Sequence, residues 1–418
     1  MKKQFALAVA LVGAVSMFTS CSDDKDEPVI PGSSLEAKTY TAAEGLTLTV
    51  DDAVTPGQTV SFTPASDGTA TITLKGEALD ITSLIPDMTA RATAPALSFP
   101  TSCVLPGSAE ASFTVTLAGD ADKATFSGSS DTEYCTFAYS GEVSNEAMTL
   151  KLSDIKLKNT SMAGTYSTHA FEENIFNVLR AYWVSENKIE IFGPGTGMDV
   201  NAIINMSFAL AQIQFGENTL PIPAIVPEVL KNVTLGEDGS VIAKYADTAV
   251  DGMPITESPK GLARYVVKDD NTLLLFLDPQ TIIANTMKMA SKSRAIDINA
   301  LLEGLMTNVV PMLANGVPVN YGARISTLDL ESDGTYTPVY DTDENAVSFY
   351  LGTEVLLPIL KTLSPLLTDD EVIQAIVDAA SQDPNMGSLA GMLPGILKSI
   401  PAVIEGTSTI EIGINLYK

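Results

Sequence analysis

Histidine and tryptophan are scarce in this chain of 418 residues, which has one of each. The single histidine, His169, excludes a metal site with two histidine ligands and leaves a Ser-His-Asp triad with only one possible base. The chain also has no GxSxG, Walker or HExxH motif. Because His169 follows the strand-like Tyr166–Thr168, we expect it on the surface at the end of a strand.

Positive charge is scarce as well: 24 Lys and Arg stand against 51 Asp and Glu, a formal net charge of −27. Such a field repels nucleic acid and anionic headgroups, so we expect no nucleic-acid partner.

The Asp and Glu residues fall mostly in predicted turns. One of these, Asp341–Asn345, would suit a loose Ca²⁺ but lacks the EF-hand spacing, so we predict no metal and no cofactor. A glycoside hydrolase that works with two carboxylates stays open as an alternative.

Cysteine occurs three times and never as CxxC, which argues against a redox role. Cys21 is discussed below. Cys103 and Cys135 both lie in strand-like surroundings, and in an oxidising compartment such a pair is a disulfide candidate. The alternative is two buried thiols.

The first 38 residues are typical of an exported, lipid-anchored protein. Lys2 and Lys3 precede a short apolar run, which is a secretory signal over residues 1–20 rather than a membrane span. Its end, Phe18-Thr-Ser-Cys21, resembles a bacterial lipobox, which implies that Cys21 is diacylated and becomes the mature N-terminus. Residues 21–38 are then an acidic, flexible tether, and two acyl chains give stable membrane attachment.

Alternation of apolar residues with Thr over residues 39–161 predicts a first, antiparallel β domain, either a barrel or a sandwich. Three Asp-Gly pairs, Asp67-Gly68, Asp238-Gly239 and Asp333-Gly334, are hairpin signals. A one-residue slip of the apolar pattern at Ser153-Asp154 predicts a β-bulge. We expect strands at Leu46–Val50, Thr59–Phe62, Thr69–Leu74 and Ser112–Leu117.

Residues 162–418 are predicted to form a second β domain of three degenerate repeats, each a hairpin followed by an apolar insert. The clearest repeat has strands Arg264–Lys268 and Thr272–Leu277 around the turn Asp269–Asn271, with a return strand over Asn320–Leu330. The other two hairpins are expected at Tyr182–Phe192 and Tyr336–Leu351. The fold class is therefore mainly β (α+β), with apolar helical inserts in the second domain.

Long uninterrupted apolar runs are also missing. None reaches the roughly 20 residues of a membrane span, because proline, which breaks or kinks a helix, punctuates the inserts. We expect short, angled helices, the clearest over Asp369–Ala380 with Thr368 as N-cap and Glu371 in a capping box. Another would start at Asp297 and end at Asn315-Gly316. The prolines are Pro227, Pro311, Pro358, Pro365 and Pro394.

Methionine is concentrated in the inserts, which we expect to gather at one end of the sheet as a helical cap over a barrel. Methionine suits adaptable apolar surfaces and also fills gaps in a core. An apolar ligand between barrel and cap, a plain core, and a surface for a partner protein are the three interpretations. The candidate ligand contacts are Met198, Met206, Met306, Met312, Met386 and Met392.

The acidic run Ser22–Glu27 after Cys21, the Thr-rich β domain and the second β domain with inserts resemble uncharacterised surface lipoproteins of Bacteroidetes. Several such families carry calycin-like β-barrel domains. The resemblance implies attachment to the outer membrane, facing outward, and it transfers no catalytic residue. Asp247-Thr248-Ala249 is similar to the O-glycosylation signal of that phylum, with Thr248 as acceptor; an ordinary turn is the alternative.

We therefore expect a non-catalytic surface lipoprotein that binds an apolar small molecule or lipid between barrel and cap. A glycan-capture or adhesion module is the alternative. Glycan surfaces favour exposed aromatic rings, whereas Trp183 lies within a strand pattern and is expected in the core. The sequence leaves the oligomeric state open.

Overall fold

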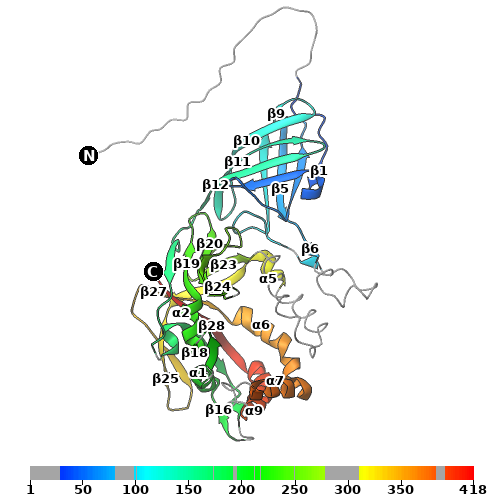
Figure 1. Ribbon diagram of the computed structural model, residues 1–418. Coiled ribbons are helices and arrows are strands. Elements are labelled where there is room, and N and C mark those ends of the chain that lie inside the picture. Colours follow the sequence, from blue (N-terminus) through cyan, green and yellow to red (C-terminus); the bar gives the residue numbers. More distant parts are fainter. Residues whose placement is uncertain are drawn as a thin grey trace, which may run out of the picture.

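The computed structural model describes residues 29–80, 98–99, 101–172, 174–191, 195–210, 212–216, 218–248, 250–277, 310–382 and 391–418 (Figure 1). The chain is mainly β, with 48% strand and 21% helix. A β-sandwich occupies one end of the molecule, an eight-stranded antiparallel barrel lies next to it, and helices gather beyond the barrel. The predicted fold class is confirmed.

The sandwich consists of two sheets. One has the strand order β1-β4-β5-β8, and the other β3-β2-β12-β11-β10-β9, in which β2 and β12 run parallel. The four predicted strands correspond to β2, β4, β5 and β8. The strands are β1 (Lys38–Tyr40), β2 (Leu46–Val50), β3 (Ala53–Val54), β4 (Gln58–Pro64), β5 (Thr69–Gly76), β8 (Glu110–Thr116), β9 (Ala118–Gly119), β10 (Lys123–Asp131), β11 (Cys135–Ser144) and β12 (Met148–Leu157).

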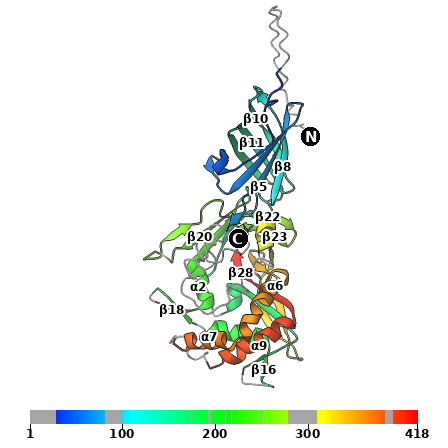
Figure 2. The same ribbon diagram turned by 90° about the vertical axis from the view of Figure 1, so that its right-hand side faces the viewer.

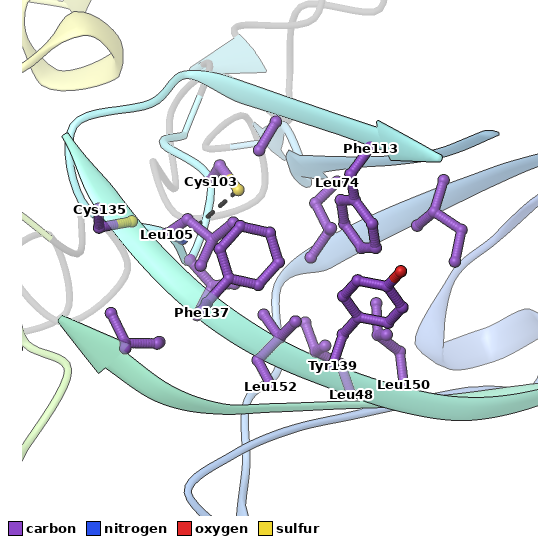
Figure 3. Packing of buried hydrophobic residues seen from close by; sticks show 14 of the residues in the cluster. Leu48, Leu74, Cys103, Leu105, Phe113, Cys135, Phe137, Tyr139, Leu150 and Leu152 are labelled. Carbon is purple, nitrogen blue, oxygen red and sulfur yellow. Dashed lines mark hydrogen bonds between the residues drawn. The ribbon is translucent and has the colours of Figure 1, made fainter. Parts of the chain in front are cut away.

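Alternation determines which side chains enter the sandwich core. In β5, Ala70, Ile72 and Leu74 are buried, whereas the threonines between them are more exposed, as expected for a strand with period two. Figure 3 shows Phe113, Phe137 and Tyr139 packed together in this core, and the rings of Phe113 and Phe137 meet edge to face at 5.3 Å.

The predicted bulge in β12 is present. The register between β11 and β12 shifts between Thr136 and Ala138, which oppose Lys156 and Ser153. Asp154, one of the extra residues, has a positive φ of 51°. A short Asx side chain tolerates this left-handed backbone better than most residues do.

The barrel closes through β13, β19, β20, β22, β23, β24, β27, β28 and back to β13, where Ser167 opposes Tyr417. β14 extends the same sheet from the other edge of β28, and β21 pairs with β20. The strands are β13 (Gly164–Ser167), β14 (Leu179–Ser185), β19 (Leu230–Leu235), β20 (Ser240–Ala246), β21 (Ile255–Glu257), β22 (Ala263–Asp269), β23 (Thr272–Leu277), β24 (Val317–Ala323), β27 (Ala346–Leu351) and β28 (Thr407–Tyr417).

All three Asp-Gly signals are hairpin turns, with glycine φ values of +78°, +80° and +83° at Gly68, Gly239 and Gly334. In each turn the aspartate accepts hydrogen bonds from the backbone N–H and the hydroxyl of the residue after the glycine. At Asp67 and Asp333 these bonds lower the carboxyl pKa. These hydrogen bonds favour the ionised carboxylate, and through the aspartate side chain they stabilise the backbone of the turn.

The prediction of three repeated hairpins is correct only for β22 and β23, which pair around the turn Asp269–Asn271. β14 pairs with β28 instead, and β15 (Ile189–Glu190) pairs with β16 (Gly197–Met198). β26 (Tyr336–Tyr340) pairs with β25 (Ile325–Leu330), not with β27. A period-two pattern gives the faces of a strand but not its partner, which is why two of the three hairpins were assigned wrongly.

The return strand expected over Asn320–Leu330 is two strands, β24 and β25, separated at Arg324. The Arg324 guanidinium donates to Asp341 and, through Nη1, to the Asn177 side chain at 2.7 Å. These bonds hold the chain at a corner. β25 and β26 therefore leave the barrel as a separate two-stranded hairpin.

The helices are short, as predicted, and four of the six that the structure describes, α2, α5, α6 and α9, contain proline. α7 begins one residue later than expected: Asp369, not Thr368, is the N-cap, and its Oδ1 accepts from the N–H of Glu371 at 2.8 Å. No helix in the described ranges is long and apolar enough to cross a membrane. The helices are α1 (Val200–Leu210), α2 (Ile222–Val229), α5 (Val310–Asn315), α6 (Thr353–Leu363), α7 (Asp370–Gln382) and α9 (Leu393–Glu405).

The helices gather as expected for a cap, with one exception. α7 and α9 pack together, α9 and α6 are in contact, and α1 lies on β14; all four lie on the side of the barrel away from the sandwich (Figures 1 and 2). α5 is the exception: it contacts β23, and Gly316 at its end lies against the ring of Phe276. The predicted helix end at Asn315-Gly316 is correct, with φ +87° at Gly316; its start at Asp297 lies outside the described residues.

Sandwich and barrel share one continuous apolar core, which runs from Leu35 to Leu416. The N–H of Leu157 donates to the carbonyl of Glu237 at 2.8 Å, across the junction. Lys260 of the barrel bonds both Asp51 of the sandwich, at 3.1 Å, and Asp238 of the barrel, at 3.0 Å. The two parts are thus packed together rather than joined by a free linker.

Candidate ligand-binding site

The register of the barrel decides which side chains face its interior. Tyr166, Val233 and Ala243 share one face through their cross-strand pairs, and the same face continues without interruption around the barrel to Ile414. The opposite face carries Ser167 and Tyr417, which meet at the closure. The described inward-facing side chains include Leu235, Val241, Tyr265, Val267, Leu273, Leu275, Val317, Val319, Tyr321, Val347, Phe349, Leu351, Ile412 and Leu416.

No Asp, Glu, Lys, Arg or His is among these described inward-facing positions. The charged residues of the same strands, such as Lys244, Arg264 and Glu411, belong to the outward-facing rows. The interior of the barrel is therefore an apolar surface with a few tyrosine hydroxyls.

The solvent exposure of the side chains along β28 shows where this apolar surface is accessible from solvent. Of its inward-facing side chains, Leu416 is 2% exposed, Ile414 is partly buried, and Ile412 is 47% exposed. Ile410, the next residue on the same face, is fully buried again. An accessible apolar position thus lies between the buried barrel core at Leu416 and the layer of helices that covers Ile410.

Aromatic side chains fill the closed part of the barrel. The ring of Tyr166 meets that of Phe349 edge to face at 5.2 Å. The Tyr166 hydroxyl donates to the carbonyl of Met162, and that of Tyr321 to the carbonyl of Asp269. Tyr265 is fully buried, and its hydroxyl has no hydrogen-bond partner among the described residues. Burial raises the pKa of all three phenols, so they stay neutral.

The helical layer begins where the barrel interior ends. Trp183 of β14 lies on the same face as Ile410, its cross-strand partner, and packs on a cluster of Ile189, Ile191, Val200, Ile203 and Val403. Its indole N–H donates to the Thr407 hydroxyl at 2.8 Å. Trp183 is therefore half-buried in a core between sheet and helices, as its strand pattern indicated.

Apolar side chains in this layer are incompletely buried. In α6 only Val355 of the described side chains is buried, and in α2 only Pro223. α6 follows directly from β27, and the Thr353 hydroxyl at its start accepts from the N–H of Ile410 at 2.9 Å. The partly exposed apolar face of α6 therefore lies next to the accessible position at Ile412.

The six predicted methionines do not form one group. Met206 of α1 and Met392, before α9, both pack on the cluster beneath Trp183. Met198 in β16 is 37% exposed at the edge of the helical layer, and Met312 is in α5, which packs against the outward-facing Phe276. Met306 and Met386 lie outside the described residues. Only Met206 and Met392 are thus placed together, in a core rather than beside Ile412.

Two arginines that the sequence analysis did not single out, Arg180 and Arg324, make ion pairs on the outward-facing side of the barrel sheet. Arg180 is 3% exposed; its Nη2 lies 2.7 Å from Glu411, its Nη1 donates to the carbonyl of Ala323, and its guanidinium stacks 3.9 Å above the ring of Tyr350. Arg324 bonds Asp341, and this bond lowers the pKa of the Asp341 carboxyl. Arg180 lies within β14 and Arg324 between β24 and β25, and the sequence around each arginine gives no signal of its partners.

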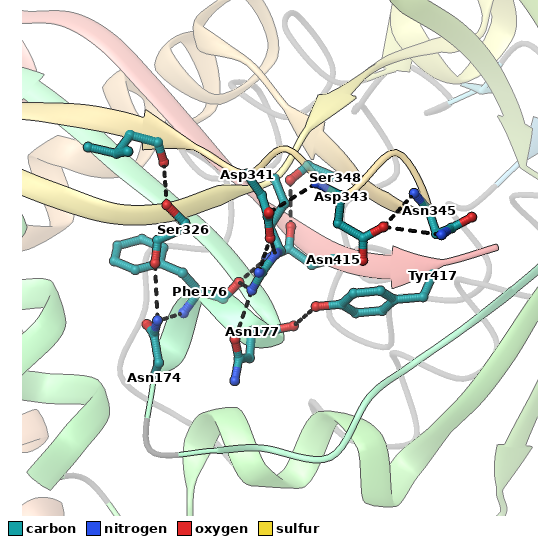
Figure 4. Close-up of polar contacts among 12 residues, drawn as sticks. Asn174, Phe176, Asn177, Ser326, Asp341, Asp343, Asn345, Ser348, Asn415 and Tyr417 are labelled. Carbon is teal, nitrogen blue, oxygen red and sulfur yellow. Dashed lines mark hydrogen bonds and ion pairs between the residues drawn. The ribbon is translucent and has the colours of Figure 1, made fainter.

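Figure 4 shows the polar contacts that surround Asn415 on the same outer face. The Asn415 side chain donates to the carbonyls of Phe176 and Leu179, and its oxygen accepts from the Ser348 hydroxyl. Asp343 accepts from the backbone and side chain of Asn345. Asp341 and Asp343 of this turn are thus engaged within the protein, and no cluster of metal-ligating residues is found in the described part of the chain.

The remaining candidate residues are placed as follows. His169 is exposed just beyond β13 and stacks on the ring of Tyr417 at 3.6 Å. Thr248 is exposed in the turn after β20, which fits both an ordinary turn and a glycosylation acceptor. Cys103 and Cys135 are free and buried, which corresponds to the alternative of two thiols rather than to the disulfide. Cys21 lies outside the described residues.

A cleft of about 230 Å³ lies between sandwich and barrel, beside Lys260. An adjoining hollow is lined by both carboxylates that bond this lysine, Asp51 and Asp238. The burial of Asp238 opposes its ionisation, but the bonds from Ser240 and Lys260 together lower its pKa. A glycosidase needs one carboxyl with a raised pKa as its acid, so this pair gives no support to that alternative.

Comparison with known proteins returned no match to this chain, whether with family models, curated proteins or solved structures.

Proposed function

We propose that this chain is a non-catalytic surface lipoprotein, anchored to the outer membrane through a lipidated Cys21, that binds an apolar small molecule or lipid between the barrel and the helical layer. The observation that carries the binding proposal is Ile412. It faces the barrel interior at 47% exposure, between Ile410, which is fully buried, and Ile414, which is partly buried.

Exposed apolar surface in this position has a cost that a ligand would remove. Each square ångström of apolar surface that leaves water stabilises a complex by roughly 25 cal/mol. The surface continues the inward-facing row of the barrel strands, and apolar surfaces with few polar groups are typical of small-molecule sites. The partly buried apolar residues of α6 would form the other wall.

The glycan-capture alternative has less support. Among the described residues, Tyr340 is the one aromatic side chain among the large exposed apolar ones, at 51%. The guanidinium of Arg180 lies 5.8 Å from its ring on the outer face. A single ring does not form the aromatic strip that stacking on a glycan needs.

The proposal is tested by native mass spectrometry on the soluble form that starts at Ser22, expressed in a lipid-producing host. We expect a co-purifying mass that leaves on denaturation. Ile412→Asn should lower its occupancy severalfold. Ile255→Asn is the matched control, because Ile255 is also an exposed isoleucine in a strand, at 48%, but lies in β21, outside the barrel.

Equal loss of the ligand from both variants would show that Ile412 does not line the site. A clean apo mass for the wild type, even after incubation with a lipid extract, would contradict the binding proposal altogether.

A further inference from the structure

The charges around the barrel interior point to the chemical class of its ligand. We infer that the ligand is an uncharged lipid, whose polar end is at most a hydroxyl, an ester or another neutral oxygen group. A fatty acid or another lipid with an ionised end is bound more weakly. This inference rests on the proposed function and narrows it.

The first argument is the absence of a counter-ion. The described inward-facing positions within the barrel strands contain no Lys, Arg or His. Lys361 of α6 and Lys418, whose ammonium lies 5.8 Å from the centre of the Tyr166 ring, are both exposed to solvent. A carboxylate moved from water to a site without a partner charge loses several kcal/mol. An apolar wall of this kind thus discriminates strongly against an ionised end, but not against a neutral one.

The second argument is that the nearest arginines already have partners on the other side of the sheet. Arg180 belongs to the outward-facing row, opposite Gly413, and is held between Glu411 and Tyr350. Arg324 is bound to Asp341 and Asn177. Neither guanidinium can turn to the interior without breaking a partly buried ion pair, which typically costs several kcal/mol.

The third argument concerns the start of α6, next to Leu351 and Ile412. A helix N-terminus attracts anions, but here the first turn carries Glu354, whose carboxylate accepts from the Asn320 side chain at 2.9 Å. The carboxylate of Glu354 thus already supplies the negative charge that the N-terminus of α6 favours. An anionic lipid end placed there would meet Glu354 and be repelled.

The interior does offer neutral polar groups. Tyr166 and Tyr321 donate their protons to backbone carbonyls. Tyr166 is buried, whereas Tyr321 is partly exposed, and its oxygen still has a lone pair that accepts. These groups suit the hydroxyl of an alcohol, which donates, and not a carboxylate, which only accepts.

The test compares decanol and decanoate, two chains of the same length, at about pH 8, where a free carboxyl is fully ionised. Trp183 is the only tryptophan and lies in the sheet beside the proposed site, so its fluorescence reports binding without a label. Decanol should bind the wild type at least tenfold more tightly than decanoate, a difference of about 1.4 kcal/mol or more.

A charge placed in the site supplies the control. Ile412→Lys, at a half-exposed position that tolerates a long polar side chain, should raise the affinity for decanoate at least tenfold, and Ile255→Lys should not. Decanoate that binds the wild type as tightly as decanol would overturn the inference and leave the proposed function standing. If neither decanol, decanoate nor decane binds, the proposed function itself fails.

Discussion

The side-chain amide of Asn201 takes the place of a neighbouring strand for Trp183. Its Oδ1 accepts from the N–H of Trp183 at 2.9 Å, and its Nδ2 donates to the carbonyl of the same residue at 2.7 Å. Asn201 is 2% exposed and comes from α1. One helix side chain thus bonds both backbone groups of Trp183 at the open edge of β14 and connects the helical layer to the sheet beside the proposed site.

Asn201→Ala should therefore destabilise the protein by about 2 kcal/mol, because it leaves two part-buried backbone groups of Trp183 without partners. Asn205→Ala, in the same helix but partly exposed, is the control and should change stability by less than about 1 kcal/mol. Urea unfolding followed by Trp183 fluorescence measures both. Similar effects of the two substitutions would show that the Asn201 contacts do not carry this stability.

Tyr265→Phe should leave stability unchanged or raise it by about 1 kcal/mol, because it removes a buried hydroxyl that has no partner among the described residues. Tyr166→Phe removes a hydroxyl that donates to Met162 at 2.9 Å and should lower stability by about 1 kcal/mol. Thermal unfolding of the two variants distinguishes them. Destabilisation by Tyr265→Phe would mean that this hydroxyl is bonded in solution.

The ion pairs of Lys260 make a small part of the stability depend on pH. The bonds to Asp238 and Asp51 raise the pKa of Lys260, so its contribution is present below the unfolded pKa near 10.4 and is lost as pH rises through the folded value. The pKa of Asp238 is lowered, so its contribution is present above its unfolded pKa near 3.9 and is lost as pH falls through the folded value.

Lys260→Met should accordingly lower the melting temperature between about pH 5 and pH 9 and have no effect below about pH 3. The loss should be below about 1 kcal/mol, because Lys260 is largely exposed and solvent screens its pairs. Melting curves over this pH range measure it. An equal loss at acid pH would assign the effect to packing rather than to charge.

Cys103 and Cys135 should be protected thiols in the form that starts at Ser22. Burial raises the pKa of Cys103 to about 11 and also raises that of Cys135. Both should thus resist a thiol reagent in the native state, and both should react after unfolding without a reductant. No reactive thiol after unfolding would show that the two residues form the disulfide instead.

The sequence predicts the features of this fold that depend on neighbouring residues. The turn at Asp67-Gly68, the bulge at Asp154 and the helix end at Gly316 each follow from the backbone preference of one or two residues. Strand partners are different: β14 pairs with β28, over 220 residues later, although the pattern indicated a hairpin with the segment directly after it. Long-range pairing is decided by packing that no local window contains.

The same limit applies to the candidate site. The alternation of Ile410, Ile412, Ile414 and Leu416 predicts one apolar face in β28, but it does not predict which of these four residues is exposed. Their difference in exposure depends on the helices that cover Ile410 and on the barrel that surrounds Leu416. Of the predicted methionines, Met206 and Met392 pack on the cluster beneath Trp183, and the methionine content of the inserts does not by itself distinguish a core from a ligand contact.

The most direct test of the central claim is to locate a ligand atom. Crystals of the form that starts at Ser22, soaked with bromodecane, should show an anomalous bromine peak or a continuous alkyl chain against Ile412, Phe349 and the apolar face of α6. Density for the chain at this place would establish that the barrel interior is a binding surface. A fully occupied soak that places bromodecane only elsewhere on the molecule would contradict the account.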